Sequence, residues 1–340
     1  MNYEDCNYDP TITAELSDED YGNIIDKIQH LLDKYPEMPF KYRSKMLRIL
    51  CISFSELNNY PMVVHYSKLS ICSDVWSEIK DVESALSMAI CEYYYSICIY
   101  YVDPNEGRKA KESALAKLTH IENQFELPPC QNDLYYYLGH MYLENDVRKS
   151  IEHLQIFIQK CSPQSINYLP SKWLLAEALM VNGEIASAEG ILKKALSESQ
   201  VTGKYSPQAY YELGLFYYHI NRPEESECML DIACDKMGTI QGLPFGDVGF
   251  VECRILLGCV KLLLGKKEDA KRLLVNGIND AKHNGIFIAW GHFNLGHIYY
   301  EESDFENALA HYKWVIDAEY ALEEYKNRAM EYIGYINPFQ

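Results

Sequence analysis

The sequence contains many side chains that could serve as bases, nucleophiles or metal ligands, with ten histidines, eleven cysteines and 49 acidic residues. So many polar groups guarantee chance pairs, and only their spacing can indicate a site. His292 and His297 are five residues apart, which places them on different faces of a helix. The sequence has no H-E-x-x-H motif, no C-x2-C pair, no G-x-S-x-G, no Walker loop and no G-x-G-x-x-G. The absence of these motifs favours a binding function over catalysis. We expect no enzyme activity, no cofactor and no metal.

The eleven cysteines are typical of packed apolar residues rather than of disulfides. Their number is odd, and most of them, such as Cys91, Cys98 and Cys259, stand among apolar residues. Cysteine acts as a small hydrophobic residue in such surroundings, and scattered thiols are typical of a reducing compartment. The N-terminal residues are acidic and lack the basic and apolar segments of a secretory signal peptide. These features predict a cytoplasmic protein.

A pattern of small and apolar residues recurs from about Asn132 to Glu319 and indicates five helix pairs. In each copy, Leu precedes Gly or Ala on the first helix, and Ala or Ser on the second helix is followed four residues later by a larger residue. Apolar residues at three- and four-residue steps are typical of amphipathic helices. The small residues of the first helices are Gly139, Ala176, Gly214, Gly258 and Gly296.

This order resembles the signature of tetratricopeptide repeats, which is L-G-x2-Y on the first helix and A-x3-F on the second. Small residues at these positions let the two helices approach closely, while larger residues fill the grooves around them. One pair cannot bury its apolar face alone, so neighbouring pairs stack and share a core. The resemblance implies an all-α fold, a TPR-like α-solenoid in which antiparallel helix pairs form a right-handed superhelix.

The copies are longer than the standard repeat. Their small residues are 37, 38, 44 and 38 positions apart, against 34 in the family. We expect extended connections between the pairs, because the segments CSPQSINYLP and MGTIQGLPFGDVG carry Pro and Gly. Repeats of this length resemble those of Gram-positive intracellular peptide-sensing regulators of the Rap and PlcR type. No helix-turn-helix precedes the repeats, so the resemblance implies action on a protein, as in Rap-type members.

The periodicity extends to both sides of the five copies. We predict an N-terminal tail and helix in 1–38, with the helix starting at Ser17, and divergent TPR-like helix pairs in 39–131, where Pro104 starts a helix. The five repeats then occupy 132–319, and a C-terminal capping helix with a polar outer face occupies 320–340. All these segments are expected to form one continuous solenoid.

The family resemblance also implies a binding groove, because the first helix of each tetratricopeptide repeat lines the concave face. Transferring the inward positions of that helix repeat by repeat gives mostly aromatic and acidic side chains. The resulting candidates for binding a peptide or partner are Tyr136, His140, Trp173, Glu177, Tyr211, Tyr218, His219, Trp290, Phe293, His297, Tyr300 and Glu301. The Lys and Asn with which co-chaperone repeats hold a carboxylate are absent from these positions. An aromatic and acidic groove suits an apolar or mildly basic peptide.

Two interpretations of the aromatic candidates remain open at this point. They line an open groove in the first, and they pack as core residues of a tightly wound solenoid in the second. The polar candidates are the better markers of a groove, because burying a polar group without a partner is costly.

The net charge of −18 argues against a nucleic-acid partner, since phosphate binding depends on Lys and Arg. No apolar run approaches the ~20 residues of a membrane-spanning helix. We therefore expect a non-catalytic scaffold that binds proteins or peptides, specifically a regulator that holds a short peptide or partner segment in its groove. The alternative is an adaptor for complex assembly that self-associates, as a homo-oligomer, through its outer or terminal surfaces.

Overall fold

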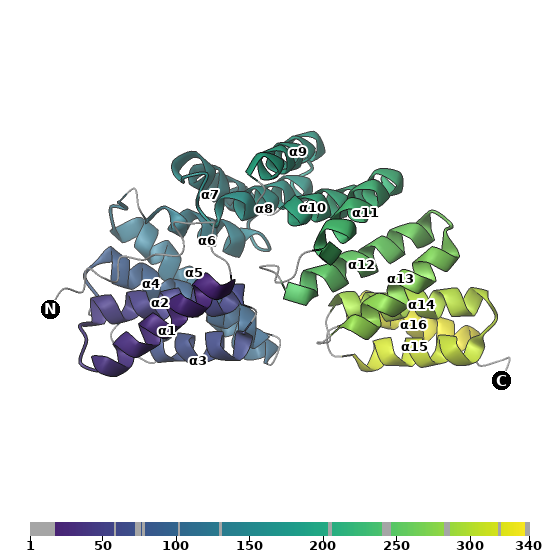
Figure 1. Cartoon of the computed structure of the whole chain (residues 1–340), viewed down its shortest axis with the longest axis horizontal. Coiled ribbons are helices and arrows are strands. Elements are labelled where there is room, and N and C mark those ends of the chain that lie inside the picture. Colours follow the sequence, from purple (N-terminus) through teal and green to yellow (C-terminus); the bar gives the residue numbers. More distant parts are fainter. Residues whose placement is uncertain are drawn as a thin grey trace. The chain divides into compact units, whose positions relative to one another are not determined.

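The computed structural model describes residues 18–57, 59–71, 76, 79–100, 103–128, 131–202, 206–239, 246–281, 286–318 and 321–336. These residues form sixteen α-helices, and none of them belongs to a β-strand (Figure 1). The predicted all-α class is confirmed. The chain divides into two compact units, residues 1–204 and 205–340.

Unit 1 contains the first nine helices. They are α1 (Asp18–Lys34), α2 (Phe40–Glu56), α3 (Tyr60–Ile71), α4 (Val82–Tyr100), α5 (Pro104–Gln124), α6 (Asp133–Tyr142), α7 (Val147–Lys160), α8 (Tyr168–Val181) and α9 (Ile185–Thr202). Helices α2 and α3, α4 and α5, α6 and α7, and α8 and α9 pack as pairs, and α1 packs against α2.

Unit 2 contains the remaining seven helices. They are α10 (Ser206–His219), α11 (Pro223–Thr239), α12 (Gly246–Leu263), α13 (Lys267–Asp280), α14 (Ile286–Glu301), α15 (Phe305–Asp317) and α16 (Glu323–Ile336). Helices α10 to α15 form three pairs, and α16 packs against α15 in the place that the first helix of another pair would take. This last helix starts at Glu323. The division of the chain into the four segments proposed above remains a prediction.

Small residues set the distance between the two helices of a pair, as the repeat pattern predicts. At four of the five predicted positions, a Cβ atom added to the glycine would overlap the larger residue of the second helix. The added Cβ atom would lie 2.5 Å from Leu154 at Gly139, 2.7 Å from Leu230 at Gly214, 2.9 Å from Leu274 at Gly258 and 2.8 Å from Tyr312 at Gly296. The Ser150 and Ser226 hydroxyls also donate hydrogen bonds of 2.7 Å to the carbonyls of Gly139 and Gly214.

The turns within four of the pairs share one backbone conformation. Each contains a residue with positive φ just after the first helix, and these residues are Gly183, Asn221, Gly265 and Ser303. At the first of these turns, the N–H of Glu184 donates to the carbonyl of Leu179, and equivalent bonds close the other three. This is the Schellman arrangement that satisfies the free carbonyls at a helix end.

The helices before residue 132 also pack in pairs. Cys51 of α2 contacts Ser67 of α3, with 3.2 Å between Sγ and Oγ. Asp103 caps α5 by accepting hydrogen bonds from the N–H groups of Asn105 and Glu106, and Pro104 is the first residue of that helix. Ser17 lies outside the described residues, and α1 is described from Asp18.

The expectation of extended connections between pairs holds for residues 161–167, whereas residues 240–245, the middle of the second segment, lie outside the described residues. Residues 161–167 connect α7 to α8 without helix. In MGTIQGLPFGDVG, Met237 to Thr239 complete α11 and Gly246 to Gly249 begin α12, so both ends of this segment are helical. The N–H groups of the first helical turn lack partners within the helix, so glycines there interrupt little.

Candidate functional site

The candidate residues of unit 1 lie on α6 and α8, the first helices of consecutive pairs. Trp173 is only 9% exposed and belongs to the packed interior. Tyr136 is half-buried, with its ring centroid 5.7 Å from that of Phe157 and 5.2 Å from that of Tyr137. Glu177 lies at the surface. In unit 1 the aromatic candidates therefore contribute to packing, and the acidic candidate faces solvent.

His140 is held by a residue that the sequence reasoning did not select. Its Nδ1 forms a hydrogen bond with the hydroxyl of Tyr93, which comes from α4 of the preceding pair. The two rings meet edge to face, with centroids 5.6 Å apart. Burial lowers the pKa of His140 to about 4, so the imidazole is neutral near pH 7. The half-buried imidazole thus has a polar partner.

Each unit also contains a carboxyl group that is shielded from water beside tyrosines. Burial raises the pKa of Glu56 in α2 to about 7, and it raises the pKa of Glu252 in α12 to about 7. The charge of Glu56 acts on Tyr94 and Tyr136, and that of Glu252 acts on Tyr211. These carboxyl groups change charge close to neutral pH, where a cation beside them would favour the ionised form.

The candidate residues of unit 2 differ widely in exposure. Tyr211 and Phe293 are 5% and 4% exposed, so they are core residues of their unit. Tyr218, Trp290, His297 and Tyr300 are half-buried, whereas His219 and Glu301 are exposed. A ligand can therefore reach the half-buried and the exposed candidates, but not Tyr211 and Phe293.

Two tyrosines of the terminal helix α16 pack against aromatic and histidine rings of α14. Tyr325 lies 5.2 Å from Phe293 and 6.5 Å from Trp290 between ring centroids. Tyr332 lies 5.5 Å from His297 and 5.2 Å from Tyr300. The sequence pattern predicts only a capping role for this helix. The seven-residue spacing of its two tyrosines places both on one helix face and was the signal for this second role.

We define the unit-2 aromatic face as five half-buried rings that three helices bring together. They are Tyr218 of α10, Trp290 and Tyr300 of α14, and Tyr325 and Tyr332 of α16. Tyr218 and Trp290 meet edge to face at 5.2 Å, although one further helix pair separates their helices in the sequence. Aromatic rings offer large, rigid contact surfaces, and their faces attract cations. The arrangement can therefore bind an extended apolar or cationic side chain.

Charged groups border this face. His297 Nε2 lies 3.4 Å from Glu301 Oε1, and Lys267 Nζ lies 2.7 Å from Glu301 Oε2. The bond from Lys267 is the main reason why the pKa of Glu301 lies below its usual range. Arg328 of α16 places its guanidinium 4.9 Å from the ring centroid of Phe293. The border therefore carries both charge signs.

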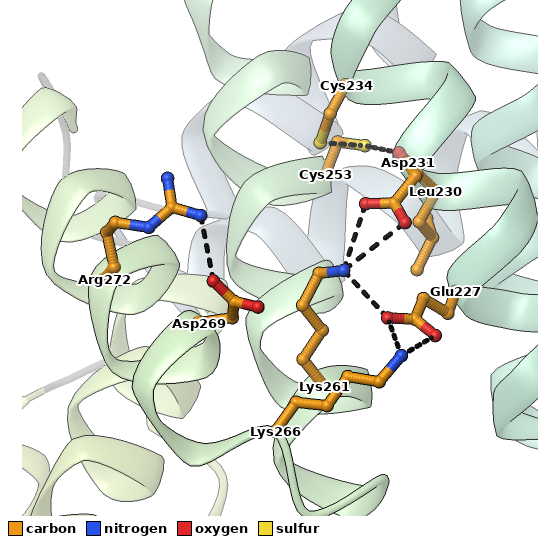
Figure 2. Close-up of polar contacts among 9 residues, drawn as sticks. All are labelled: Glu227, Leu230, Asp231, Cys234, Cys253, Lys261, Lys266, Asp269 and Arg272. Carbon is orange, nitrogen blue, oxygen red and sulfur yellow. Dashed lines mark hydrogen bonds and ion pairs between the residues drawn. The ribbon is translucent and has the colours of Figure 1, made fainter.

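An ion-pair network joins α11 to α12, the helix between α10 and α14 (Figure 2). Lys261 Nζ lies 2.8 Å from Glu227 Oε1 and 3.2 Å from Asp231 Oδ1. Lys266 Nζ lies 2.6 Å from the other Glu227 oxygen. Because several charges share partners here, the network constrains the helices more than an isolated surface pair would.

In the part of the chain that the structure describes, no helix has both the length and the apolar character needed to span a bilayer. Among the same residues, no three His, Cys, Asp or Glu side chains come together as a metal site.

The sequence matches no family model and no curated protein, but the fold is similar to that of solved structures. A chain of the Cut9–Hcn1 hetero-tetramer of the APC/C superposes with a TM-score of 0.60 at 13% identity, covering 92% of this chain and 52% of that one. Yeast Tom70 superposes with a TM-score of 0.55 at 13% identity, covering 95% and 60%. The chain thus spans about half the length of the Cut9 chain.

Rap protein, solved in complex with competence and sporulation factor, is similar over nearly the whole of both chains. The TM-score is 0.57 at 12% identity, covering 93% of this chain and 98% of that one. At such identities the similarity concerns the fold. It confirms a TPR-like α-solenoid and the resemblance in fold to Rap-type regulators.

Proposed function

We propose that this chain is a non-catalytic scaffold that binds proteins or peptides, and that it acts as a regulator by holding a short peptide or partner segment. The observation that carries the proposal is the unit-2 aromatic face, where α10, α14 and α16 leave five rings half-buried. The fold is similar to that of Rap protein, which was solved with competence and sporulation factor bound. The free cysteines among the described residues favour a cytoplasmic location.

The chemistry of the face favours an apolar or mildly basic segment. Ring faces attract ammonium and guanidinium groups, and buried aromatic contacts supply most of the energy of many interfaces. Glu301 adds a carboxylate at the border. Glu252, whose pKa is about 7, would become more acidic beside a bound cation.

The test compares the full chain with variants for retention of small peptides from its host cytosol. Immobilised wild type, Tyr218→Ala, Tyr325→Ala and Tyr335→Ala are exposed to the low-molecular-mass fraction, and retained species are identified by mass spectrometry. Tyr335 is 57% exposed on α16 and serves as the matched control. We expect one peptide to be enriched on wild type and Tyr335→Ala and to be lost from the other two variants. Equal retention by all four proteins, or no retained peptide, would refute the proposal.

A self-associating adaptor is the second candidate, because exposed apolar side chains lie on α16 and just before it. Leu322, Met330 and Tyr335 are 49%, 48% and 57% exposed. A second copy of the chain could cover these side chains. Sedimentation of wild type should then show a concentration-dependent dimer that Met330→Lys abolishes, whereas a monomer at all concentrations would exclude this candidate.

A further inference from the structure

Two cysteines of unit 2 face each other across the contact between α11 and α12. The Sγ atoms of Cys234 and Cys253 are 3.0 Å apart, and Figure 2 shows the two side chains pointing toward one another. Both sulfurs are free thiols. A disulfide bond is about 2.05 Å long, so an approach of about 1 Å would allow the bond to form.

The two thiols differ in their access to solvent. Cys234 is half-buried, whereas Cys253 is fully buried within the apolar cluster that also contains Tyr211, Leu256 and Met237. A small oxidant from solvent therefore meets the Cys234 sulfur first. The Cys253 sulfur is shielded from solvent but lies within reach of its neighbour.

The acid–base properties of Cys253 favour the same order of events. The pKa of the Cys253 thiol is raised well above its usual range, first because it is hydrogen-bonded to Cys234 and then because it is buried. The thiolate is the reactive form of cysteine. Cys253 is therefore a poor first target for an oxidant.

We propose that Cys234 and Cys253 form a redox-active pair, which hydroperoxides oxidise to an intramolecular disulfide joining α11 to α12. The Cys234 thiolate attacks a peroxide oxygen, the O–O bond breaks, and an alkoxide or hydroxide leaves, so that Cys234 becomes a sulfenic acid. The Cys253 thiolate then attacks the Cys234 sulfur, the S–O bond breaks, and the departing hydroxide becomes water. Two thiols and one hydroperoxide thus give one disulfide, one water and one alcohol, or a second water from hydrogen peroxide. This modification does not depend on peptide binding.

Other cysteines of the chain provide internal controls. Cys51 and Cys91 in unit 1 also face each other, but their sulfurs are 3.9 Å apart and both residues are 0% exposed. Cys228 is exposed on α11, the same helix as Cys234. The Cys234 and Cys253 pair combines two close sulfurs with one that is accessible to solvent. Cys51 and Cys91 are close but buried, and Cys228 is accessible but serves as the control for a thiol outside the pair.

The test treats the reduced full chain with hydrogen peroxide, alkylates the remaining thiols and maps tryptic peptides without reduction. The Cys228→Ser variant is used as the background, because Cys228 and Cys234 share the tryptic peptide 205–236 while Cys253 falls in 237–254. We expect these two peptides to appear linked as the main oxidised species, and dithiothreitol to separate them. Cys51 and Cys91 should remain reduced over the same time.

Variants of each sulfur test the proposed order. With Cys253→Ala, oxidation should continue past the sulfenic acid to sulfinic acid on Cys234, and with Cys234→Ser the peptide containing Cys253 should remain reduced. The oxidised background protein should also melt at a higher temperature than its reduced form, because a cross-link restricts the unfolded chain. The proposal is overturned if Cys234 in the background protein is oxidised to sulfinic acid while Cys253 is still alkylated. It also fails if Cys51 and Cys91 are linked first.

Discussion

At the scale of single residues, Gly214 shows how a missing methyl group sets the distance between two helices. A Cβ atom at this position would lie 2.7 Å from Leu230 Cγ, and the Gly214 carbonyl also accepts the Ser226 hydroxyl. We predict that Gly214→Ala lowers the free energy of unfolding by about 1–3 kcal/mol, because the crowded helices must shift apart. Urea unfolding followed by circular dichroism measures this change.

Gly190 provides the matched control for this substitution. It lies within α9, and a Cβ atom there would have no neighbour within 4 Å. Gly190→Ala should therefore stabilise the protein by up to about 1 kcal/mol through helix propensity alone. If both substitutions destabilise to the same extent, close helix approach is not the function of the small repeat residue.

At the scale of elements, the recurrent turn between paired helices tolerates different residues at different cost. Ser303 adopts a φ of 62°, in the left-handed region that glycine occupies at Gly183 and Gly265. A side chain in that region is strained by roughly 1–2 kcal/mol, part of which is offset by the greater flexibility that glycine gives the unfolded chain. Ser303→Gly should raise the free energy of unfolding by about 0.5–1 kcal/mol.

The opposite substitution at the equivalent turn tests the same idea. Gly265→Ala places a methyl group at a φ of 74° and should destabilise the protein by about 1 kcal/mol or more, although nothing lies within 4 Å of the added atom. Thermal unfolding of both variants gives the comparison. A stabilising effect of Gly265→Ala would show that the turn relaxes, and that the left-handed conformation is not needed.

At the scale of the whole molecule, the repeat pattern predicted the fold well because it reports a local packing rule. Gly214 and Leu230 can be matched from spacing alone, since the rule acts between helices that adjoin in the sequence. Contacts that skip a helix pair, such as Tyr218 with Trp290, have no local signature. The sequence also could not divide the aromatic candidates into core and surface residues, because the exposure of each ring depends on which side chains of later helices cover it. Thus Phe293 is buried beneath α16, while Trp290 remains half-buried.

Shielded ionisable groups in both units should shape the pH dependence of stability. Burial lowers the pKa of His140 and of His292 to about 4, in the latter case with a contribution from His311. The two imidazoles take up protons more readily in the unfolded chain than in the folded chain. The contribution of the neutral imidazoles to stability is therefore lost as the pH falls from about 6.5 toward 4. Glu56 and Glu252 have a pKa of about 7 in the folded chain. As the pH rises, these carboxyl groups therefore lose their protons at a lower pH in the unfolded chain than in the folded chain. Their contribution is lost as the pH rises from about 4.5 to 7.

The two effects oppose each other over the same pH range, so the contribution of one carboxyl group has to be isolated by substitution. We predict that Glu252→Gln unfolds at the same urea concentration as wild type at pH 4.5 and becomes more stable than wild type as the pH rises. The difference should approach about 3 kcal/mol above pH 7, because an amide does not ionise in the shielded position. Glu331→Gln, at an exposed position of α16, is the matched control and should follow wild type throughout. A constant difference between Glu252→Gln and wild type across this pH range would mean that Glu252 is solvated in the folded chain, and that the carboxyl group is not shielded beside Tyr211.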